Sequence, residues 1–514
     1  MQATAQQERM TSTPSARRRL AGLLVPVAVF AVLLANALTD GYFRDEFYYL
    51  ACARRLAWGY VDHPPLSVAL LAVITAIFGD SLIVLRVTAA AAGAAFVWLT
   101  GRLARRLGGG RTAETIAMLS AAVSPMLLGT ATFYSMNVLE ILIWTLAAYL
   151  FLNVLEQPST GRWAHLGVLL GLGLLNKISV LWLGAGLAIG LLVWRRVVLA
   201  TRGPWIAAAL AALCLIPHVA WQIANGWPTI EFIRNASGQK MQENSAVQFI
   251  AEQVMNAHPV TAPVWIGGLV YLLISRRAQP YRSMACVFLV PLAILLLNRT
   301  SRSGYLAPAY PVMFAAGGVA LQSLLATPMR RRAAVVLILA AGLVTVPLAV
   351  PMLPTAEYVA YSAALGVAPS TEEKKDLGRL PQFFADREGW PQLVSAVVAA
   401  WQQLPADERA HAAFLAGNYG EAGAVEQLAG DRGIPVISGH NNYWLWGYGG
   451  REISTVVVLA QSRERLDSRF TSVEAVGRIE CGDCMPYENE KTVFVARGAK
   501  QPWPQLWTGL RHYD

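Results

Sequence analysis

Charged side chains are scarce in this sequence. They make up 14% of its 514 residues, against about 25% in an ordinary soluble domain. Hydrophobic residues contribute 55%, and the mean hydropathy is +0.42. These values exclude an ordinary soluble protein and predict an integral membrane protein. Acidic residues are especially few before residue 350, so those that occur there are candidates for function.

Signatures of nucleotide and nucleic-acid binding are also absent. The sequence has no P-loop and no G-x-G-x-x-G after a strand-like segment. Its net charge of +10 arises largely from short arginine clusters between apolar runs, as the positive-inside rule expects. No basic stripe interleaved with aromatic residues accompanies these clusters. We therefore expect membrane lipids as partners and no nucleic acid.

Cysteine is rare, with five residues in the chain. Cys52, Cys214 and Cys286 stand singly in apolar surroundings, which predicts inert core thiols. Cys481 and Cys484 have the spacing of a redox motif or of half a zinc site. A zinc site would need two more ligands, and no Cys or His pair lies nearby in the sequence. A local disulfide outside the cytoplasm is the preferred interpretation.

Apolar runs and arginine clusters alternate along the first 350 residues. This pattern predicts a cytoplasmic tail over residues 1–19 and a polytopic membrane domain over 20–350, with an outer loop at 39–66. About eleven spans are expected, at 20–38, 81–100, 113–129, 137–155, two within 163–194, 205–221, 260–274, one ending at 298, one ending before 330 and one ending near 350.

Two parts of this predicted topology, the first apolar run and the pair of short spans around Lys177, can each be interpreted in a second way. Ala35-Asn36-Ala37 resembles a signal-peptidase site, so the first apolar run is either a span or a cleaved signal peptide. The two short spans on either side of Lys177 are either true spans or a buried amphipathic hairpin, which would change the number of spans.

The composition changes after residue 350, where charged residues become common. Segments 411–416, 434–438, 454–460 and 471–479 have strand-like patterns among helical stretches. We expect residues 351–514 to form a soluble extracytoplasmic α/β domain.

The outer loop concentrates side chains that can do chemistry. Its sequence is TDGYFRDEFYYLACARRLAWGYVDHPPL, which holds Asp45, Glu46, Asp62 and His63. A carboxylate at the mouth of a membrane helix can act as a general base toward a hydroxyl or as a ligand of a divalent metal. The alternative is that these side chains cap helices and turns at the membrane surface.

Further polar residues fall on the same predicted face. Asn137 and Glu140 are three apart and share a helical face, Lys177 lies in a helix break, and Arg302 and Tyr305 open a span. Cations at this face would hold the charge of a phosphate, and carboxylates would hold sugar or acceptor hydroxyls. As alternatives, Glu140 is a structural partner of Lys177, and the cations are anchors at the interface.

In the expected outer domain, the segment NNYWLW combines amides with aromatic rings that suit carbohydrate binding. Asn442 and Trp444 are therefore candidates for binding an acceptor. Packing against the membrane domain is the equal alternative.

Several blocks resemble a known family. They are YFRDEFYYL, WGYVDHPPL, GRLARRLGGGRTAE, NVLEILIWTLAAYLF, LLNKIS, SGYLAPAYPVMFAAGGVAL, NYGEAGAVEQL, PVISGHNNYWLWGYG and CGDCMPYEN. The sequence is similar through them to bacterial membrane glycosyltransferases of the GT-C type. More specifically, it resembles the family-39 group related to dolichyl-phosphate-mannose protein mannosyltransferases and lipid A sugar transferases. The blocks cover nearly the whole chain in order.

The resemblance implies roles for individual residues. Asp45, with Glu46 beside it, matches the catalytic carboxylate motif, and Asp45 would take the proton of the acceptor hydroxyl. Lys177 and Arg302 would hold the donor phosphate with Tyr305, assisted by Arg44. Glu140 matches a second acidic position, whereas Asn137 stands where many relatives have an aspartate. That departure leaves open whether a divalent metal is held, with Glu46 and Glu140 as its candidate ligands.

The expected function is therefore transfer of a sugar, with inversion, from a polyprenyl-phosphate donor to an acceptor that is a lipid, a glycan or a protein. It would occur at the outer face of a bacterial inner membrane, with the N-terminus in the cytoplasm. A transporter or flippase is the alternative, and it predicts ionisable groups near the membrane midplane and an inverted repeat. Neither signal stands out in the sequence.

Overall fold

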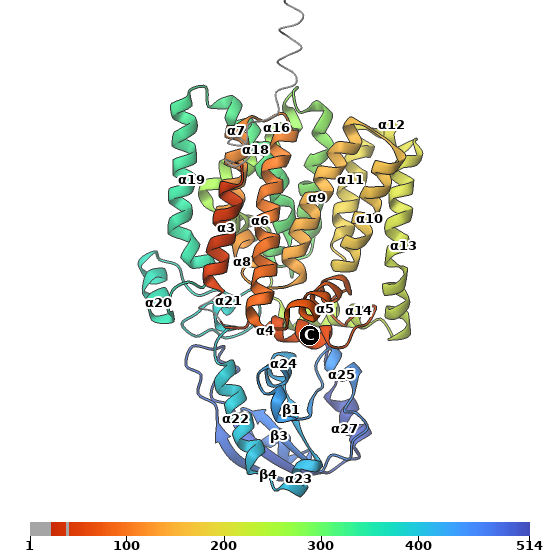
Figure 1. Ribbon diagram of the computed structural model, residues 1–514, viewed down its shortest axis with the longest axis vertical. Coiled ribbons are helices and arrows are strands. Elements are labelled where there is room, and N and C mark those ends of the chain that lie inside the picture. The colour runs from red at the N-terminus through yellow and green to blue at the C-terminus, as the bar shows by residue number, and fades with distance from the viewer. Residues whose placement is uncertain (1–21, 38–40) are drawn as a thin grey trace, which may run out of the picture.

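The computed structural model describes residues 22–37 and 41–514. It has a layer of long helices at one end and a smaller domain with a sheet at the other (Figure 1). The expected cytoplasmic tail at residues 1–19 lies outside the described residues.

Helices occupy every segment in which a span was expected. They are α3 (Leu24–Asn36), α6 (Leu82–Arg106), α7 (Arg111–Val123), α9 (Met136–Glu156), α10 (Thr160–Asn176), α11 (Val180–Trp194), α13 (Arg202–Ala224), α16 (Ala262–Ile274), α17 (Cys286–Leu297), α18 (Tyr310–Leu324) and α19 (Pro328–Ala349). Within the described ranges, six helical segments are long and apolar enough to cross a membrane. A bent pair, Ala246–Ala257 with Pro259–Ile274, would be a seventh. The protein is a multi-pass membrane protein, and the number eleven stays a prediction.

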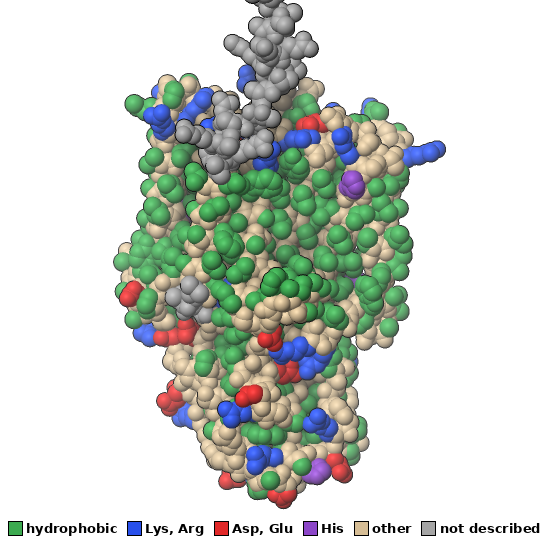
Figure 2. Space-filling model, viewed as in Figure 1, with side chains coloured by type: hydrophobic (Ala, Val, Ile, Leu, Met, Phe, Trp, Pro, Cys, Tyr) green, Lys and Arg blue, Asp and Glu red, His purple; other side chains and the backbone are tan. Residues whose placement is uncertain are grey.

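The surface of the helical layer is largely hydrophobic, as Figure 2 shows. Lys and Arg side chains gather at the end of this layer that lies away from the sheet domain. This distribution agrees with the alternation read from the sequence. The orientation of the termini across the membrane stays a prediction.

Short elements lie between the long helices, and two more, α20 and α21, lie between α19 and the smaller domain. They are α4 (Arg44–Ala53), α5 (Leu66–Phe78), α8 (Pro125–Thr130), α12 (Arg196–Leu199), α14 (Pro228–Asn235), η1 (Ala236–Lys240), α15 (Ala246–Ala257), η2 (Pro259–Thr261), η3 (Gln279–Ala285), η4 (Ser303–Ala309), α20 (Thr355–Ala364) and α21 (Gln382–Ala385). No element was expected at α5 from the sequence. Its Val73, Ile77 and Phe78 side chains are exposed, as expected for an apolar helix at a membrane surface.

The smaller domain, called the outer domain after the location expected for residues 351–514, contains a five-stranded mixed sheet in the order β2-β1-β3-β5-β4. Its elements are α22 (Trp390–Gln403), α23 (Ala406–Ala410), β1 (Ala412–Ala416), α24 (Tyr419–Leu428), η5 (Gly430–Arg432), β2 (Val436–Ser438), α25 (Asn442–Trp446), β3 (Thr455–Ala460), α26 (Glu464–Asp467), β4 (Phe470–Arg478), β5 (Thr492–Ala499) and α27 (Trp503–Leu510). β1 pairs in parallel with β2 and β3, whereas β5 runs antiparallel to β3 and β4. Strands form in all four expected segments, and β5 was not anticipated.

One hydrophobic core runs from the helical layer into the outer domain. Phe47 and Tyr48 of α4 belong to the same buried cluster as Tyr419 and Ala422 of α24. Side chains packed in this way resist relative movement because each displacement loses contacts on both sides. α4 is therefore held between the two parts of the molecule, where Figure 1 shows it.

Candidate active site

Asp45 lies in the first turn of α4, at the seam between the helical layer and the outer domain. Its Oδ1 accepts a hydrogen bond of 2.8 Å from the Tyr419 hydroxyl and lies 3.6 Å from Nε of Arg44. The side chain remains 35% exposed. Asp45 is thus an oriented carboxylate that a substrate can still reach.

The neighbouring Glu46 has a different environment. It is completely buried, and its Oε2 accepts the Phe43 N–H at 2.9 Å and lies 3.0 Å from Nη2 of Arg86 on α6. Its Oε1 accepts the Tyr134 N–H at 2.9 Å. Because both oxygens are enclosed and hydrogen-bonded, this environment does not fit the expectation that Glu46 acts in catalysis or binds a metal. Its contacts instead anchor α4 to the helical layer.

Lys177 gathers several of the expected residues at the break between α10 and α11. Its Nζ donates to Oδ1 of Asn137 at 2.8 Å and to Oε2 of Glu140 at 2.7 Å, and it lies 4.9 Å from the centre of the Tyr305 ring. The Ser179 hydroxyl also donates to Glu140. Glu140 and Lys177 are therefore paired, and the choice between a structural role and substrate binding for Glu140 stays a prediction. An ammonium has three hydrogens, and these two bonds leave one for a ligand.

Arg302 is the second cation that was expected at the donor phosphate. It precedes η4 and pairs with Glu373, which lies in the segment between the membrane helices and the outer domain. Burial alone would lower the pKa of Arg302. The pKa is nevertheless raised, because Tyr305, the carboxylates of Glu373 and Glu372, and Asp45 outweigh burial. Arg302 is thus a permanent cation, and Asp45 is among the groups whose negative charge acts on it.

Glu373 was not anticipated from the sequence, and it faces three cations. Burial opposes its ionisation, but Lys240, Arg44 and Arg302 together lower its pKa to about 2. Lys240 lies at the end of η1, and its Nζ is 3.9 Å from Glu373 Oε1. The site therefore contains one more cation, Lys240, and one more carboxylate, Glu373, than the sequence led us to expect.

Arg44 is enclosed by groups of the outer domain. Its Nη1 donates to the Tyr487 hydroxyl at 2.6 Å and lies 3.6 Å from Oδ1 of Asp386. The Arg44 backbone N–H donates to the Asp386 carbonyl at 3.1 Å. These contacts give Arg44 a role in joining α4 to the outer domain, beside its expected role at the phosphate.

Asp386 makes the stability of this junction depend on pH. Burial raises the pKa of its carboxyl from 3.8 to about 6; Arg44 opposes the rise, whereas Asp45 and Glu373 add to it. The folded protein therefore binds this proton more tightly than the unfolded chain does. The resulting stabilisation is complete below about pH 4, falls as the pH rises to about 6 and is lost above that, a change of about 3 kcal/mol.

Thermal denaturation in detergent can test this dependence. We expect the melting temperature of the protein, relative to that of Asp386→Asn, to fall between about pH 4 and pH 6 and to stay level at higher pH. A constant difference across this range would contradict the assignment.

Asp62 and His63 lie beside each other at the end of the outer loop. Nε2 of His63 is 3.7 Å from Oδ1 of Asp62, and the His63 ring stacks on Tyr49 at 5.0 Å. Burial raises the pKa of Asp62; His63 opposes the rise and the charge of Asp45 adds to it. The charge of Asp45 thus reaches Asp62, whereas His63 is 1% exposed and enclosed by the protein.

Asn442 and Trp444 bind groups within the protein. Oδ1 of Asn442 accepts the Tyr48 hydroxyl at 3.0 Å and the Val61 N–H at 2.7 Å. Trp444 Nε1 donates to the Trp507 carbonyl at 3.0 Å. These contacts fit the packing alternative better than acceptor binding, since Asn442 ties the outer domain to α4 and to the outer loop.

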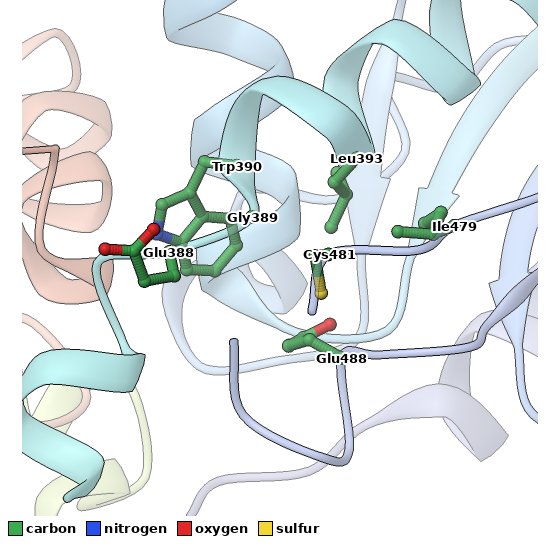
Figure 3. Close-up of a pocket in the computed structure, with 7 residues that line it drawn as sticks. All are labelled: Glu388, Gly389, Trp390, Leu393, Ile479, Cys481 and Glu488. Atoms are coloured by element: carbon green, nitrogen blue, oxygen red, sulfur yellow. The ribbon is translucent and has the colours of Figure 1, made fainter. Parts of the chain in front are cut away.

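Cys481 and Cys484 form a disulfide. Figure 3 shows Cys481 between Leu393 and Glu488, beside a pocket of about 10 Å³, which is about the space of one water. A Cβ on Gly389 would lie 2.7 Å from Cβ of Cys481, so the disulfide loop packs tightly against the start of α22. This pocket is a small gap in the packing of the outer domain, and it cannot hold a sugar.

Glu46 and Glu140 do not form a metal cluster with other ligands in the described residues. The group whose donor atoms lie within 4.8 Å of one another there is His440, His512 and Asp514. Nδ1 of His440 accepts the Tyr419 N–H at 3.3 Å, and Nε2 lies 2.9 Å from the Asp514 carbonyl. Both ring nitrogens are thus engaged within the protein, which accounts for this cluster without an ion.

The fold has solved counterparts. The crystal structure of ArnT from Cupriavidus metallidurans bound to undecaprenyl phosphate superposes with a TM-score of 0.61 and 16% sequence identity, covering 94% of this chain and 98% of that one. This is the GT-C fold. Residues 62–221 also match a family model described as dolichyl-phosphate-mannose-protein mannosyltransferase. The resemblance inferred from the sequence is confirmed.

Two curated relatives of this GT-C chain are named as sugar transferases. The lipid A galacturonosyltransferase RgtD of Rhizobium johnstonii is 25% identical over 297 residues, which are 55% of this chain and 61% of the relative. The undecaprenyl phosphate-alpha-4-amino-4-deoxy-L-arabinose arabinosyl transferase 1 of Pseudomonas fluorescens is 26% identical over 267 residues, 48% of this chain and 46% of the relative. The chain thus matches between about half and three fifths of the length of these relatives.

The residues that the sequence analysis missed come from distant segments. They are Tyr419, Asp386, Tyr487, Glu373 and Lys240. Four of them lie in or beside the outer domain, where charged and aromatic residues are common, so composition does not single them out. Two of the resembling blocks included such residues: NYGEAGAVEQL holds Tyr419 and CGDCMPYEN holds Tyr487.

Proposed function

We propose that this protein is a membrane glycosyltransferase that transfers a sugar from a polyprenyl-phosphate carrier to an acceptor hydroxyl. The supporting observation is the accessible carboxylate of Asp45 together with the half-buried cation Arg302, whose charge interacts with it and which belongs to a larger cationic group. A reaction that removes a proton from one substrate and releases a phosphate from the other needs these two kinds of charge.

The proposed reaction has a single displacement step. Asp45 takes the proton of the acceptor hydroxyl, and the oxygen attacks the anomeric carbon of the donor sugar. The bond between that carbon and the phosphate oxygen breaks, and its electron pair leaves with the polyprenyl phosphate. Attack from the face opposite the phosphate inverts the configuration. Lys177 and Arg302 stabilise the negative charge on the leaving group, and the Tyr305 hydroxyl donates to it.

The place of the reaction follows from the topology. We propose that Asp45 and the outer domain lie on the outer face of a bacterial inner membrane, with the N-terminus in the cytoplasm. The apolar surface of the helical layer and the basic end away from the outer domain support this orientation (Figure 2). The polyprenyl chain would then lie in the bilayer while its phosphate reaches the seam.

A panel of polyprenyl-phosphate sugars tests the function. Purified protein is incubated with each donor and with lipid A, glycan or peptide acceptors, and mass spectrometry follows free polyprenyl phosphate and the glycosylated acceptor. We expect both products to appear together for one donor. A donor that crosses a vesicle membrane intact, without product, would overturn the proposal and favour a flippase.

The positive charge of Lys177 carries a further prediction. Changing Lys177 alone would leave Glu140 buried without its partner, so the informative variant is Lys177→Gln with Glu140→Gln. We expect turnover to fall about a hundredfold, because the leaving phosphate loses a cation. The matched control is Glu140→Gln alone, which keeps the ammonium and should remain within a few fold of the unmodified protein. Equal losses in both variants would assign the effect to the carboxylate instead.

A further inference from the structure

Helix α24 of the outer domain begins at the proposed base. The Asn418 side chain caps the helix by accepting the Glu421 N–H at 3.0 Å, so Tyr419 is its first residue. Figure 1 places α24 at the end of the outer domain that faces the membrane helices, close to α4. The cap thus fixes where the tyrosine lies in the seam.

Two glycines let α24 approach α4 closely. A Cβ at Gly420 would lie 2.6 Å from Cγ of Arg44, and one at Gly423 would lie 2.7 Å from Cβ of Phe47. Residues three apart share a helical face, so both glycines face α4. The motif NYGEAGA therefore supplies the helix cap, the tyrosine and the two glycines that let α24 pack closely on α4. This combination has a structural reason that the sequence alone did not reveal.

The Tyr419 side chain is fixed on several sides. Its ring lies 4.8 Å from the rings of both Tyr48 and His440, and the Arg44 guanidinium is 5.6 Å from its centre. Its hydroxyl donates to Asp45 Oδ1 at 2.8 Å. Burial raises the pKa of Tyr419 well above its usual value, and although Arg44 opposes this, the charge of Asp45 adds to it. The hydroxyl therefore keeps its proton and stays a donor.

We propose that Tyr419 is a positioning residue for Asp45, so that the outer domain completes the active site. The inference rests on the proposed function, in which Asp45 is the base. The tyrosine hydroxyl and Arg44 both approach Oδ1, which leaves Oδ2 to meet the acceptor hydroxyl. Tyr419 transfers no proton itself. It holds the carboxylate in the rotamer from which the transfer occurs.

Tyr419→Phe in the full-length protein removes this hydrogen bond and little else. We expect turnover to fall about tenfold, as for loss of a hydrogen bond to a charged group, with donor affinity unchanged. Rates are counted per donor-binding site, so a loss of folded protein does not lower them. The matched control is Tyr443→Phe on α25, because the Tyr443 hydroxyl is also in the outer domain but donates to Glu426 at 3.1 Å. This control should stay within about twofold.

A double variant shows whether Tyr419 acts through Asp45. If it does, adding Tyr419→Phe to Asp45→Asn leaves the residual rate unchanged, because the group that it positions is gone. A further tenfold loss would overturn the inference, and so would a normal rate in Tyr419→Phe when Asp45→Asn is inactive. Full activity in Asp45→Asn would instead overturn the proposed function itself, so the two failures are distinguishable.

Discussion

Asp45→Asn is expected to lower the turnover of sugar transfer by about a hundred- to ten-thousandfold, the range over which a general base contributes to catalysis. Asparagine keeps the shape of the side chain but cannot accept the proton of the acceptor hydroxyl. Donor affinity should be retained, because Lys177 and Arg302 are unchanged. The release of polyprenyl phosphate, followed by mass spectrometry, measures the first effect, and equilibrium binding of the donor measures the second.

A matched carboxylate serves as the control for this substitution. Asp467 lies in an exposed ion pair with Arg463 in the outer domain, and Asp467→Asn should leave turnover unchanged. Asp45→Asn should also melt near the temperature of the unmodified protein, since the Asp45 side chain is partly exposed. A variant that lost donor binding together with turnover would show that Asp45 holds the substrate and does not act as the base.

Glu46→Gln, at the next position of the same helix, is expected to lower the stability of the folded protein. It would remove the negative charge that Glu46 places 3.0 Å from Arg86, which is 1% exposed. Breaking a buried ion pair from one side typically costs about 3–5 kcal/mol. We expect a clear fall in melting temperature and in the yield of folded protein, followed by differential scanning fluorimetry in detergent.

The control for Glu46→Gln is the same substitution in a solvent-exposed ion pair. Arg497 and Glu474 lie 3.0 Å apart, with Glu474 61% exposed, and such pairs contribute about 0–1 kcal/mol. Glu474→Gln should therefore melt almost unchanged. If Glu46→Gln melted like Glu474→Gln but lost turnover, the chemical role that the sequence suggested for Glu46 would be restored.

These two neighbours show where sequence reasoning stops. Asp45 and Glu46 are both acidic residues at the start of one short helix, and nothing in their types tells them apart. Successive side chains of a helix point about 100° apart, so one faces the seam and the other faces α6. The choice depends on Arg86, and an arginine inside an apolar run was the available signal that a buried partner existed.

The helical layer could be predicted because the bilayer imposes a length and a composition on each span. Lys177, Glu140 and Asn137 could be grouped because helical spacing and topology place them at one face. The outer domain offered weaker signals: four strands had apolar patterns, but β5 (Thr492–Ala499) carries Arg497 and Gly498 near its end and was missed. The pairing of Arg44 with Asp386 and Tyr487 could not be predicted, since it joins segments more than three hundred residues apart.

The glycine face of α24 limits how such proteins can be recombined. Exchanging the outer domain for that of a relative would exchange Tyr419 and its two glycines at the same time, and so would replace part of the catalytic geometry along with the exposed surface. A chimera designed to change acceptor choice should therefore keep residues 418–423 of the parent whose α4 it retains. Its boundary belongs within the outer domain, beyond the start of α24, rather than at the linker before α20.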